Sequence, residues 1–282
     1  MDYPIFIPTY KRNRIITYEH LPQELQERVV MVVHPSSTLE ETYPKARFWK
    51  TRLQGKGIAL VRQGMLEECR EKHIPVCIMI DDDLKFKEAV FNDPDRPDHK
   101  RFVKASEESI IKAFTDLSNK ALGEVTLKDG FKIKTAFTTF STPFFNLTKN
   151  TWGFNKRMAH SFFINVETTR ECNFKGLAMM SDVKFSLECY TRGLCSWSSM
   201  YLAAVDSSKP GQGGCASLNR TREFEGAIGY LTQRWPNYVK ERDASRNQRH
   251  QKNLGTTRDI SFWPMKAWKA WVYLQGHHPH LS

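Results

Sequence analysis

Three consecutive carboxylates, Asp81, Asp82 and Asp83, directly follow an apolar run over residues 74–80. The run includes Pro75 and β-branched residues, which is typical of a strand buried on both faces of an α/β sheet. Adjacent like charges raise one another's pKa unless a cation is shared among them. Carboxylate oxygens prefer a hard ion such as Mg²⁺ or Mn²⁺, and such ions often hold phosphates. The triplet therefore predicts a metal and phosphate site at the carboxyl end of a strand, with a solvated acidic loop as the alternative.

The elements expected before this strand alternate between extended and helical segments. We expect strands over residues 3–8, 28–35 and 57–63, and helices over residues 21–27, 39–43 and 63–72. The first strand stops at Pro8 and delivers the following polar residues, up to Arg14, into a loop. This βαβα order with short connections predicts the α/β class, with a mixed, largely parallel sheet flanked by helices.

The second half of the chain continues the pattern and then changes composition. Residues 91–101 form a Pro- and Asp-rich loop, and Ser106 caps a helix over residues 107–122. Strands are expected over 132–140 and 161–166, followed by a helix over 182–192 that Gly193 closes. A glycine-rich loop over 209–217 lacks the lysine of an ATP-binding loop. We predict one catalytic domain over residues 1–282, with a basic C-terminal elaboration over about 210–282.

The net charge of +11 and the pI of about 9.3 favour a polyanionic partner such as nucleic acid. Residues 220–269 contain eleven Lys and Arg against five Asp and Glu, so this segment holds more than half of the excess charge. Aromatic residues interleave the basic ones, as expected of a groove that follows a nucleic-acid backbone and offers stacking faces. The alternative is a basic enzyme whose aromatic rings belong to the core.

Cysteine usage and hydropathy bear on the compartment. The six cysteines form no CxxC pair, so we expect buried thiols and neither a zinc site nor a disulfide framework. No segment approaches the ~20 apolar residues that span a bilayer. The first residues lack the order of a signal peptide, and the expectation is a cytoplasmic protein without a membrane partner.

Taken together, the motifs resemble those of glycosyltransferases with the GT-A fold. The similarity rests on IPTYKR at residues 7–12, GIALVRQ at 57–63, IDDDL at 80–84, SDVKFSL at 181–187 and GGCASLNR at 213–220. The closer resemblance is to the phage TET-associated glycosyltransferases and to phage hydroxymethylcytosine arabinosyl-type transferases. It implies a sugar transfer from a nucleotide-sugar to a hydroxymethylated pyrimidine in DNA, in the host cytoplasm if the gene is phage-encoded.

The resemblance also implies roles for individual residues. Asp81 and Asp83 would hold Mn²⁺ or Mg²⁺ directly or through a second layer, and Asp82 or Asp81 would bind the donor ribose. The remaining donor contacts would come from Pro8, Thr9, Tyr10, Arg12, Arg62 and Gln63. A diphosphate leaving group gains charge as its bond to the sugar breaks, which is why a divalent ion and arginines suit it.

Asp182 is the candidate general base that would deprotonate the acceptor hydroxyl, with Glu188 as the second choice. This family usually has two acids here, so Ser181-Asp182 is a partial departure, and a helix N-cap is the alternative role of Asp182. The residues expected at the acceptor or its DNA are His160, Gly213, Gly214, Ser217, Arg220, Arg222, Arg246 and Arg249. A C-terminal histidine often completes the metal site in this fold, and the sequence does not choose among His250, His277, His278 and His280.

Two other functions remain open at this point. The same fold could act on a protein or glycan acceptor, and the donor sugar and nucleotide are undetermined beyond the expectation of a UDP-sugar. A nucleic-acid-binding protein or metal nuclease is the more distant alternative, because a two-metal nuclease needs several separated carboxylates and the triplet supplies only part of that set.

Overall fold

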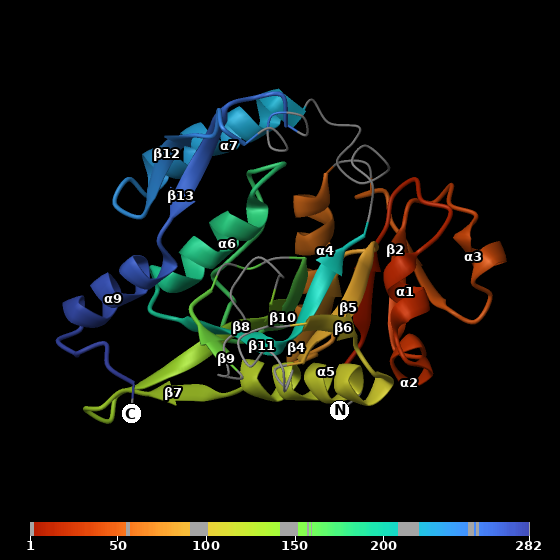
Figure 1. The fold of residues 1–282 in the computed structure, drawn as a ribbon, viewed down its shortest axis with the longest axis horizontal. Helices are drawn as coiled ribbons and strands as arrows, with labels where there is room; N and C mark the ends of the chain where they lie inside the picture. The colour runs from red at the N-terminus through yellow and green to blue at the C-terminus, as the bar shows by residue number, and fades with distance from the viewer. Residues whose placement is uncertain are drawn as a thin grey trace.

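The computed structural model describes residues 3–54, 57–90, 101–141, 152–156, 158, 160–207, 220–247, 251 and 254–281. Within this part of the chain a mixed sheet of 11 strands runs in the order β3-β2-β1-β4-β10-β8-β11-β5-β6, with β7 added to β8 and β9 to β11 (Figure 1). Its strands are β1 (Ile5–Pro8), β2 (Val29–Val33), β3 (Arg47–Lys50), β4 (Val76–Ile80), β5 (Leu84–Val90), β6 (Arg101–Lys104), β7 (Glu124–Thr126), β8 (Lys132–Ser141), β9 (Trp152–Phe154), β10 (Ser161–Asn165) and β11 (Cys195–Asp206).

Helices flank this sheet, and a small hairpin lies beyond it. The helices are α1 (Ile16–His20), α2 (Gln23–Gln26), α3 (Leu39–Thr42), α4 (Ile58–Glu71), α5 (Glu107–Ala121), α6 (Ser181–Tyr190), α7 (Arg220–Arg234) and α9 (Pro264–Leu274), and the hairpin pairs β12 (Val239–Asp243) with β13 (Arg258–Phe262). The expected α/β class with a mixed sheet between helices is confirmed.

Parallel pairing is concentrated in one part of the sheet. β3, β2, β1 and β4 are parallel neighbours, and β8 is parallel to β11. β10 runs antiparallel between β4 and β8. As a result, the carboxyl ends of β1 and β4 and the beginning of β10 meet at one edge, where open α/β sheets bind ligands.

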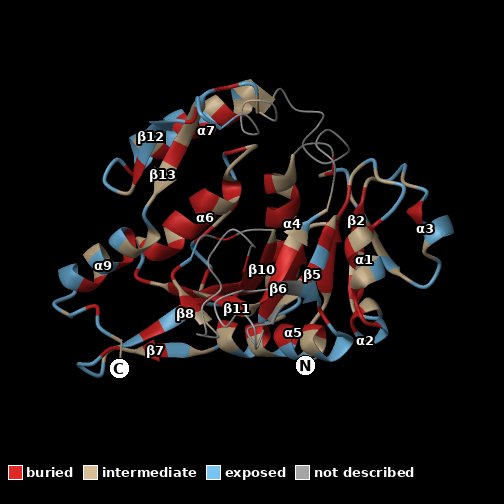
Figure 2. Cartoon of the chain, in the orientation of Figure 1, coloured by how far each residue is buried: buried red, intermediate tan, exposed pale blue. Residues whose placement is uncertain are grey.

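The side chains of β4 alternate between two cores, one on each face of the sheet. Cys77 and Met79 join the cluster beneath α4, α6 and α9, whereas Val76, Ile78 and Ile80 join the cluster beneath α1, α2 and α5. Every residue of β4 is buried, as Figure 2 shows for the centre of the sheet. The prediction of a strand covered on both faces is therefore confirmed, and it fixes where the acidic residues emerge.

One element was predicted wrongly. Residues 57–63 were expected to be extended, but α4 is helical from Ile58 to Glu71. Val61, Met65 and Cys69, spaced four residues apart, are all buried on the sheet side of this helix. A short apolar run fits both a buried strand and a buried helix, and here the helical spacing of the residues that follow decides. The actual third strand is β3, an edge strand whose residues are only partly buried.

Other predicted elements agree with the structure. Ser106 caps α5 by accepting a hydrogen bond from the backbone N–H of Ser109. The expected strands at 132–140 and 161–166 are β8 and β10, and the helix expected at 21–27 is α2, whereas α1 precedes it and was not predicted. The loop at 91–101, apart from the start of β6, and the glycine-rich loop at 209–217 lie outside the described residues.

α6 ends as predicted, with Gly193 in the left-handed region at a φ of 80°. The N–H of Gly193 bonds to the Tyr190 carbonyl and that of Leu194 to the Cys189 carbonyl, which closes the last turn. The ring of Trp271, from α9, lies directly against Gly193 in the space that a Cβ atom would fill. This close approach fixes α9 to the C-terminal end of α6.

The C-terminal elements share a third apolar cluster with α6. Phe224, Ile228 and Leu231 of α7 and Ile260 of β13 pack with Leu187 of α6. The basic segment is thus built onto the central sheet through α6, and the prediction of a single domain stays a prediction.

The described cysteines are buried, as expected. Cys69, Cys77, Cys172, Cys189 and Cys195 are all free and inaccessible. The sulfur atoms of Cys172 and Cys189 lie 3.6 Å apart. Cys215 lies outside the described residues.

Candidate functional site

The three carboxylates form a tight turn between β4 and β5, which we call the acid turn (residues 81–83). Thr17 of α1 binds the backbone of the acid turn. The Thr17 hydroxyl donates to the Asp81 carbonyl at 2.5 Å and accepts from the Leu84 N–H at 2.8 Å. The Thr17 N–H donates to the Asp82 carbonyl at 3.2 Å. The turn is therefore fixed at its backbone, and its side chains meet partners at the sheet edge.

Two arginines face the acid turn. Arg12, from the loop after β1, donates to Asp83 Oδ2 at 3.0 Å and lies 3.4 Å from Asp82 Oδ2. Arg62, in the first turns of α4, donates to Asp81 Oδ1 at 3.0 Å. The Arg62 guanidinium also lies 4.6 Å from the centre of the Phe162 ring, which adds a cation–π contact. Positive charge from two separate elements thus compensates the repulsion within the turn.

Neighbouring acids in the turn differ in their ease of ionisation. Burial acts to raise the pKa of Asp81, but Arg62 and His160 outweigh it and hold the pKa below its ordinary value. For Asp82, burial prevails over Arg12 and raises the pKa to about 6. Asp81 is therefore ionised over the physiological range, whereas Asp82 takes up a proton in mildly acidic solution.

His160 and the end of β11 complete the edge. His160 Nδ1 lies 3.3 Å from Asp81 Oδ2, and the His160 carbonyl accepts from the Asp81 N–H at 2.9 Å. Burial lowers the pKa of His160, but Asp81, Asp206 and other nearby acids outweigh it and raise the pKa. Ser207 donates from its N–H and its hydroxyl to the Asp83 carbonyl at 2.9 and 2.7 Å.

Backbone strain accompanies this arrangement. His160 has a φ of 48°, and Lys11 and Met180 have φ values of 55° and 56°, all in the region that favours glycine. His160 directly precedes β10, Lys11 belongs to the loop after β1, and Met180 directly precedes α6. Such conformations cost of order 1–3 kcal/mol each and concentrate at functional sites.

The other predicted donor residues separate into two groups. Pro8 ends β1, Thr9 is buried beside it, and Tyr10 meets the His34 ring edge-on at 6.2 Å at the ends of β1 and β2. Gln63 does not join them: it donates to Glu67 at 3.0 Å and accepts from the Phe174 N–H at 2.9 Å. Gln63 therefore ties α4 to the chain that leads into α6.

Asp182 and Glu188 both lie on α6 but in different surroundings. The helix begins at Ser181 with Met180 at the N-cap, so Asp182 is a half-buried residue of its first turn. Glu188 accepts from Lys184 Nζ at 2.6 Å and from the Asn173 N–H at 2.8 Å, so both its oxygens are engaged. Figure 1 shows the N-terminal end of α6 on the same side of the molecule as that of α4.

Comparison with known protein families agrees with this geometry. Residues 3–214, which include the whole acid turn, both arginines and α6, match the family model of TET-associated glycosyltransferases. The chain belongs to this family. The curated proteins compared with it include no match.

As a TET-associated glycosyltransferase, the chain is an enzyme that transfers a sugar, and its family implies a nucleotide-sugar donor and an acceptor. The matched segment ends before α7, so the elements from Arg220 onward lie beyond it. Among the described residues, no helix has the length and hydropathy needed to cross a membrane.

The transferase residues predicted at the acceptor are only partly described. Arg220 and Arg222 lie in the first turn of α7, and Arg246 is exposed after β12. Gly213, Gly214, Ser217, Arg249 and the candidate metal ligand His250 lie outside the described residues. His277 is 3.0 Å from Asp129 and stacks on Phe131 at 3.8 Å, beside the turn between β7 and β8.

The described acids and histidines contain no group of three that could bind a metal ion on its own. Asp81 and Asp83 nevertheless present hard oxygen ligands at the carboxyl end of β4. Mg²⁺ typically takes only one or two protein carboxylates and completes its shell with waters and substrate phosphates. The residues present therefore fit an ion that binds together with a diphosphate.

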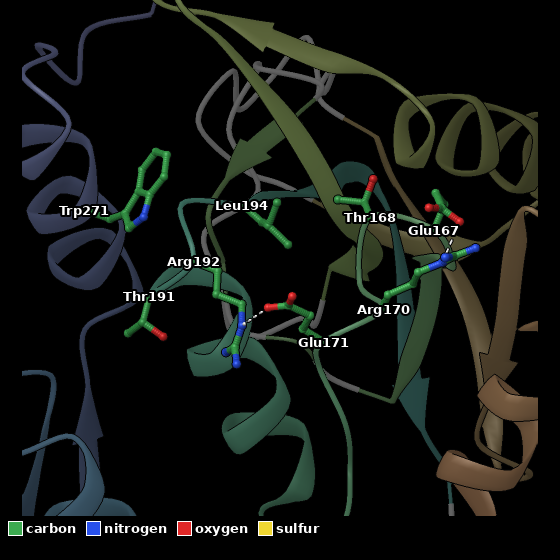
Figure 3. Close-up of a pocket in the computed structure, with 8 residues that line it drawn as sticks. All are labelled: Glu167, Thr168, Arg170, Glu171, Thr191, Arg192, Leu194 and Trp271. Atoms are coloured by element: carbon green, nitrogen blue, oxygen red, sulfur yellow. Dashed lines mark ion pairs between the residues drawn. The ribbon is translucent and has the colours of Figure 1, made fainter.

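The structure also contains a separate groove (Figure 3). It has a volume of about 490 Å³ and is lined by Glu167, Thr168, Arg170, Glu171, Thr191, Arg192, Leu194 and Trp271. Its arginines are paired, Arg170 with Glu167 at 2.8 Å and Arg192 with Glu171 at 3.5 Å. Because β10 is antiparallel to β4, this groove follows the end of β10 that faces away from the acid turn.

Proposed function

We propose that this enzyme transfers a sugar from a nucleotide-sugar, most simply a UDP-sugar, to the hydroxymethyl group of 5-hydroxymethylcytosine in double-stranded phage DNA, with Mn²⁺ or Mg²⁺ as cofactor. The observation that carries the proposal is the acid turn, held against Arg12 and Arg62 at the carboxyl edge of β1 and β4. A protein or glycan acceptor is the alternative for the same chemistry. A nuclease would require more separated carboxylates.

At the donor, Asp81 and Asp83 would hold the metal ion, and Asp82 would accept hydrogen bonds from the ribose hydroxyls. The bound ion neutralises charge that develops on the departing diphosphate. Arg12 and Arg62 contact these carboxylates, and their guanidinium groups would also donate to the diphosphate oxygens. Bidentate donation from arginine suits phosphate well. Thr9, Tyr10 and the neighbouring His34 would line the nucleoside pocket.

At the acceptor, Asp182 would serve as general base. The hydroxymethyl oxygen attacks the anomeric carbon while the bond from that carbon to the diphosphate oxygen breaks, and Asp182 takes the hydroxyl proton. Asp182 is a better choice than Glu188, because Lys184 and Asn173 occupy both oxygens of Glu188. A positioned base contributes about 10²–10⁴-fold in rate. His160, on the rim of the acid turn, would contact the acceptor.

The choice of DNA as acceptor rests on the charge of the chain and on the family. A base within a duplex must leave the stack to reach a buried donor, and phosphate contacts must hold the flanking duplex. Arg220, Arg222, Arg246 and Arg249 would supply contacts that do not depend on sequence.

The first test is a nucleotide-release assay with Mn²⁺, a panel of UDP-sugars, and matched DNA carrying cytosine or 5-hydroxymethylcytosine, followed by mass analysis of nucleosides. We expect added sugar mass only on the hydroxymethylated base. Donor turnover without a DNA product would redirect the search to a protein or glycan acceptor. Absence of turnover with every donor would contradict the assigned role of the acid turn.

Variants separate the roles. Asp83→Ala should abolish metal-dependent donor hydrolysis, whereas Asp182→Asn should abolish transfer and retain donor binding measured by calorimetry. The matched control is Asp116→Asn. Asp116 lies on α5, where its carboxylate contacts Tyr201 of β11 and Lys112 of the same helix. If the wild type cleaves DNA and transfers no sugar, and Asp83→Ala abolishes that cleavage, the nuclease alternative is favoured.

A further inference from the structure

The outward side of α9 and its N-cap carry large apolar side chains that are partly or largely exposed in the described structure. Trp263, Tyr273 and Leu274 are 40%, 55% and 81% exposed, and they make up half of the six exposed large hydrophobic residues that the described chain contains. Figure 2 shows α9 at the margin of the molecule, with exposed positions along its outer side. This concentration is unusual for a surface that faces only solvent.

The exposed positions follow the helical repeat. Ala267, Trp268 and Val272 are buried against the core, while Lys266, Lys269 and Tyr273 are exposed at intervals of three and four residues on the opposite side. We call Trp263, Lys266, Lys269, Tyr273 and Leu274 the α9 stripe. Trp263 and Tyr273 stand about 15 Å apart along the helix, with the two lysines between them.

Among the described residues, no acid compensates the charge of this stripe, unlike that of the neighbouring hairpin. On β12 and β13, Arg242 is paired with Asp259 and Arg258 with Glu241, so the hairpin neutralises its own arginines. Residues 263–281 contain no Asp or Glu. Within the described residues, no carboxylate lies within ion-pair distance of Lys266 or Lys269. A polyanionic partner complements the positive charge of this surface, whereas a cationic partner would be repelled by it.

We propose that the α9 stripe binds the DNA that flanks the acceptor nucleotide, an inference that rests on the DNA acceptor proposed above. Lys266 and Lys269 contact phosphates, and the aromatic side chains of Trp263 and Tyr273 lie against sugars or bases. α9 packs on the C-terminal end of α6, where Trp271 meets Gly193 (Figure 1). The ten residues of α6 span about 15 Å from Ser181, next to Asp182, to this end, a length of about four base pairs.

The test measures binding of the full chain to unmodified duplex DNA, about two helical turns long, by fluorescence anisotropy between about 50 and 200 mM salt. We expect the double variant Lys266→Gln, Lys269→Gln to reduce the slope of log affinity against log salt by about two, since each lost phosphate contact removes about 0.9. The gap in affinity between variant and wild type should then narrow about tenfold over this salt range. An unchanged slope would overturn the inference.

The matched control is Lys45→Gln, Lys104→Gln, which removes the same charge from exposed positions near the two edge strands, β3 and β6. It should leave the slope within error of the wild type. A second variant, Tyr273→Ser, Leu274→Ser, should weaken binding several-fold at constant slope, because neither residue is charged. Thermal unfolding of each variant verifies that the fold is intact.

Three further results separate the possibilities. Stripe-dependent binding to phosphatidylglycerol vesicles, with DNA binding unaffected by the variants, would overturn the inference in favour of an anionic membrane. If the enzyme transfers sugar to DNA but the double lysine variant leaves the salt slope unchanged, the proposed DNA contact of the α9 stripe is wrong and the proposed reaction stands. A reduced slope without any sugar transfer would support the stripe as a DNA contact and contradict the proposed reaction.

Discussion

Asp81, Asp82 and Asp83 are adjacent in the chain, yet each has a different set of partners. Arg62 and His160 contact Asp81, Arg12 lies between Asp82 and Asp83, and Thr17 and Ser207 hold the backbone. These differences lower the pKa of Asp81 and raise that of Asp82, although the two side chains are identical. They also explain how a run of like charges is stable at the end of a buried strand.

Asp82 makes a pH dependence measurable. Its pKa is about 6 in the folded protein, above the ordinary value near 3.8, so the folded state binds more protons than the unfolded chain between about pH 4 and 6. Stability contributed by the protonated acid is therefore lost as pH rises through this window, by about 3 kcal/mol in total. In metal-free buffer, Asp82→Asn should become progressively more stable than wild type from pH 4.5 to 7.5, measured by urea unfolding.

Glu24→Gln, at an exposed position of α2, is the control for a general change in charge. Its unfolding free energy should follow the wild-type pH profile. Parallel profiles for Asp82→Asn and wild type would show that Asp82 ionises normally in the folded protein.

At the scale of elements, α1 is a short helix whose main role is to hold the acid turn. The buried Thr17 hydroxyl donates to the Asp81 carbonyl and accepts from the Leu84 N–H. Thr17→Val keeps the shape but leaves two buried backbone groups without this partner, at about 1–3 kcal/mol each. We expect a loss of about 2–4 kcal/mol in unfolding free energy and a lower kcat.

Thr17→Ser is the matched variant because it retains the hydroxyl. It should recover most of the stability and most of the activity. Equal losses in the Val and Ser variants would mean that the methyl group, and not the hydrogen bonds, holds the turn.

The contact between α6 and α9 depends on a residue without a side chain. Gly193→Ala introduces backbone strain at a φ of 80° and a methyl group that overlaps the Trp271 ring. Gly130→Ala, at a φ of 86° with no atom near its Cβ position, introduces the strain alone. We expect a loss of about 1 kcal/mol for Gly130→Ala and a further 1–3 kcal/mol for Gly193→Ala, measured by urea unfolding. Equal losses would indicate that α9 adjusts freely.

How far the sequence predicts these elements depends on how strong the local signal is. β4 and the Ser106 cap of α5 were predicted correctly, because a long apolar run and a capping serine are local features. α4 was partly assigned to a strand, because residues 57–63 fit either repeat. β3 was missed, since an exposed edge strand of four residues has little apolar signal.

The site shows the same division. The acid turn and Arg62 follow from local motifs, and the structure brings them together. Thr17 and Ser207 were missed because their bonds to the turn connect residues far apart in the chain, in the case of Ser207 and Asp83 by 124 positions. No short motif encodes such contacts, and only the topology of the sheet creates them.

At the scale of the whole molecule, the sheet and the C-terminal elements share α6 as a common support. Phe185 faces the core of the sheet, whereas Leu187 faces α7 and β13. We expect the chain to unfold in one transition when followed by far-UV and near-UV circular dichroism. Leu231→Ala, in the fully buried part of α7, should shift both signals together by about 2–5 kcal/mol.

Leu274→Ala provides the comparison, because the same side chain is 81% exposed at that position and its removal should cost little. Separate transitions for the two signals, with only one shifted by Leu231→Ala, would indicate that the elements from Arg220 onward form an independent domain.

The five buried thiols in the described part of the chain can report how often individual helices open. A thiol reagent reaches Cys69 or Cys77 only when α4 leaves the sheet, and it reaches Cys172 or Cys189 only when α6 moves away from the core. Labelling rates, assigned to each cysteine by mass spectrometry, therefore report how often each helix opens. A nucleotide-sugar bound against Arg62 would slow labelling beneath α4, which provides a readout of donor binding that requires neither an acceptor nor turnover.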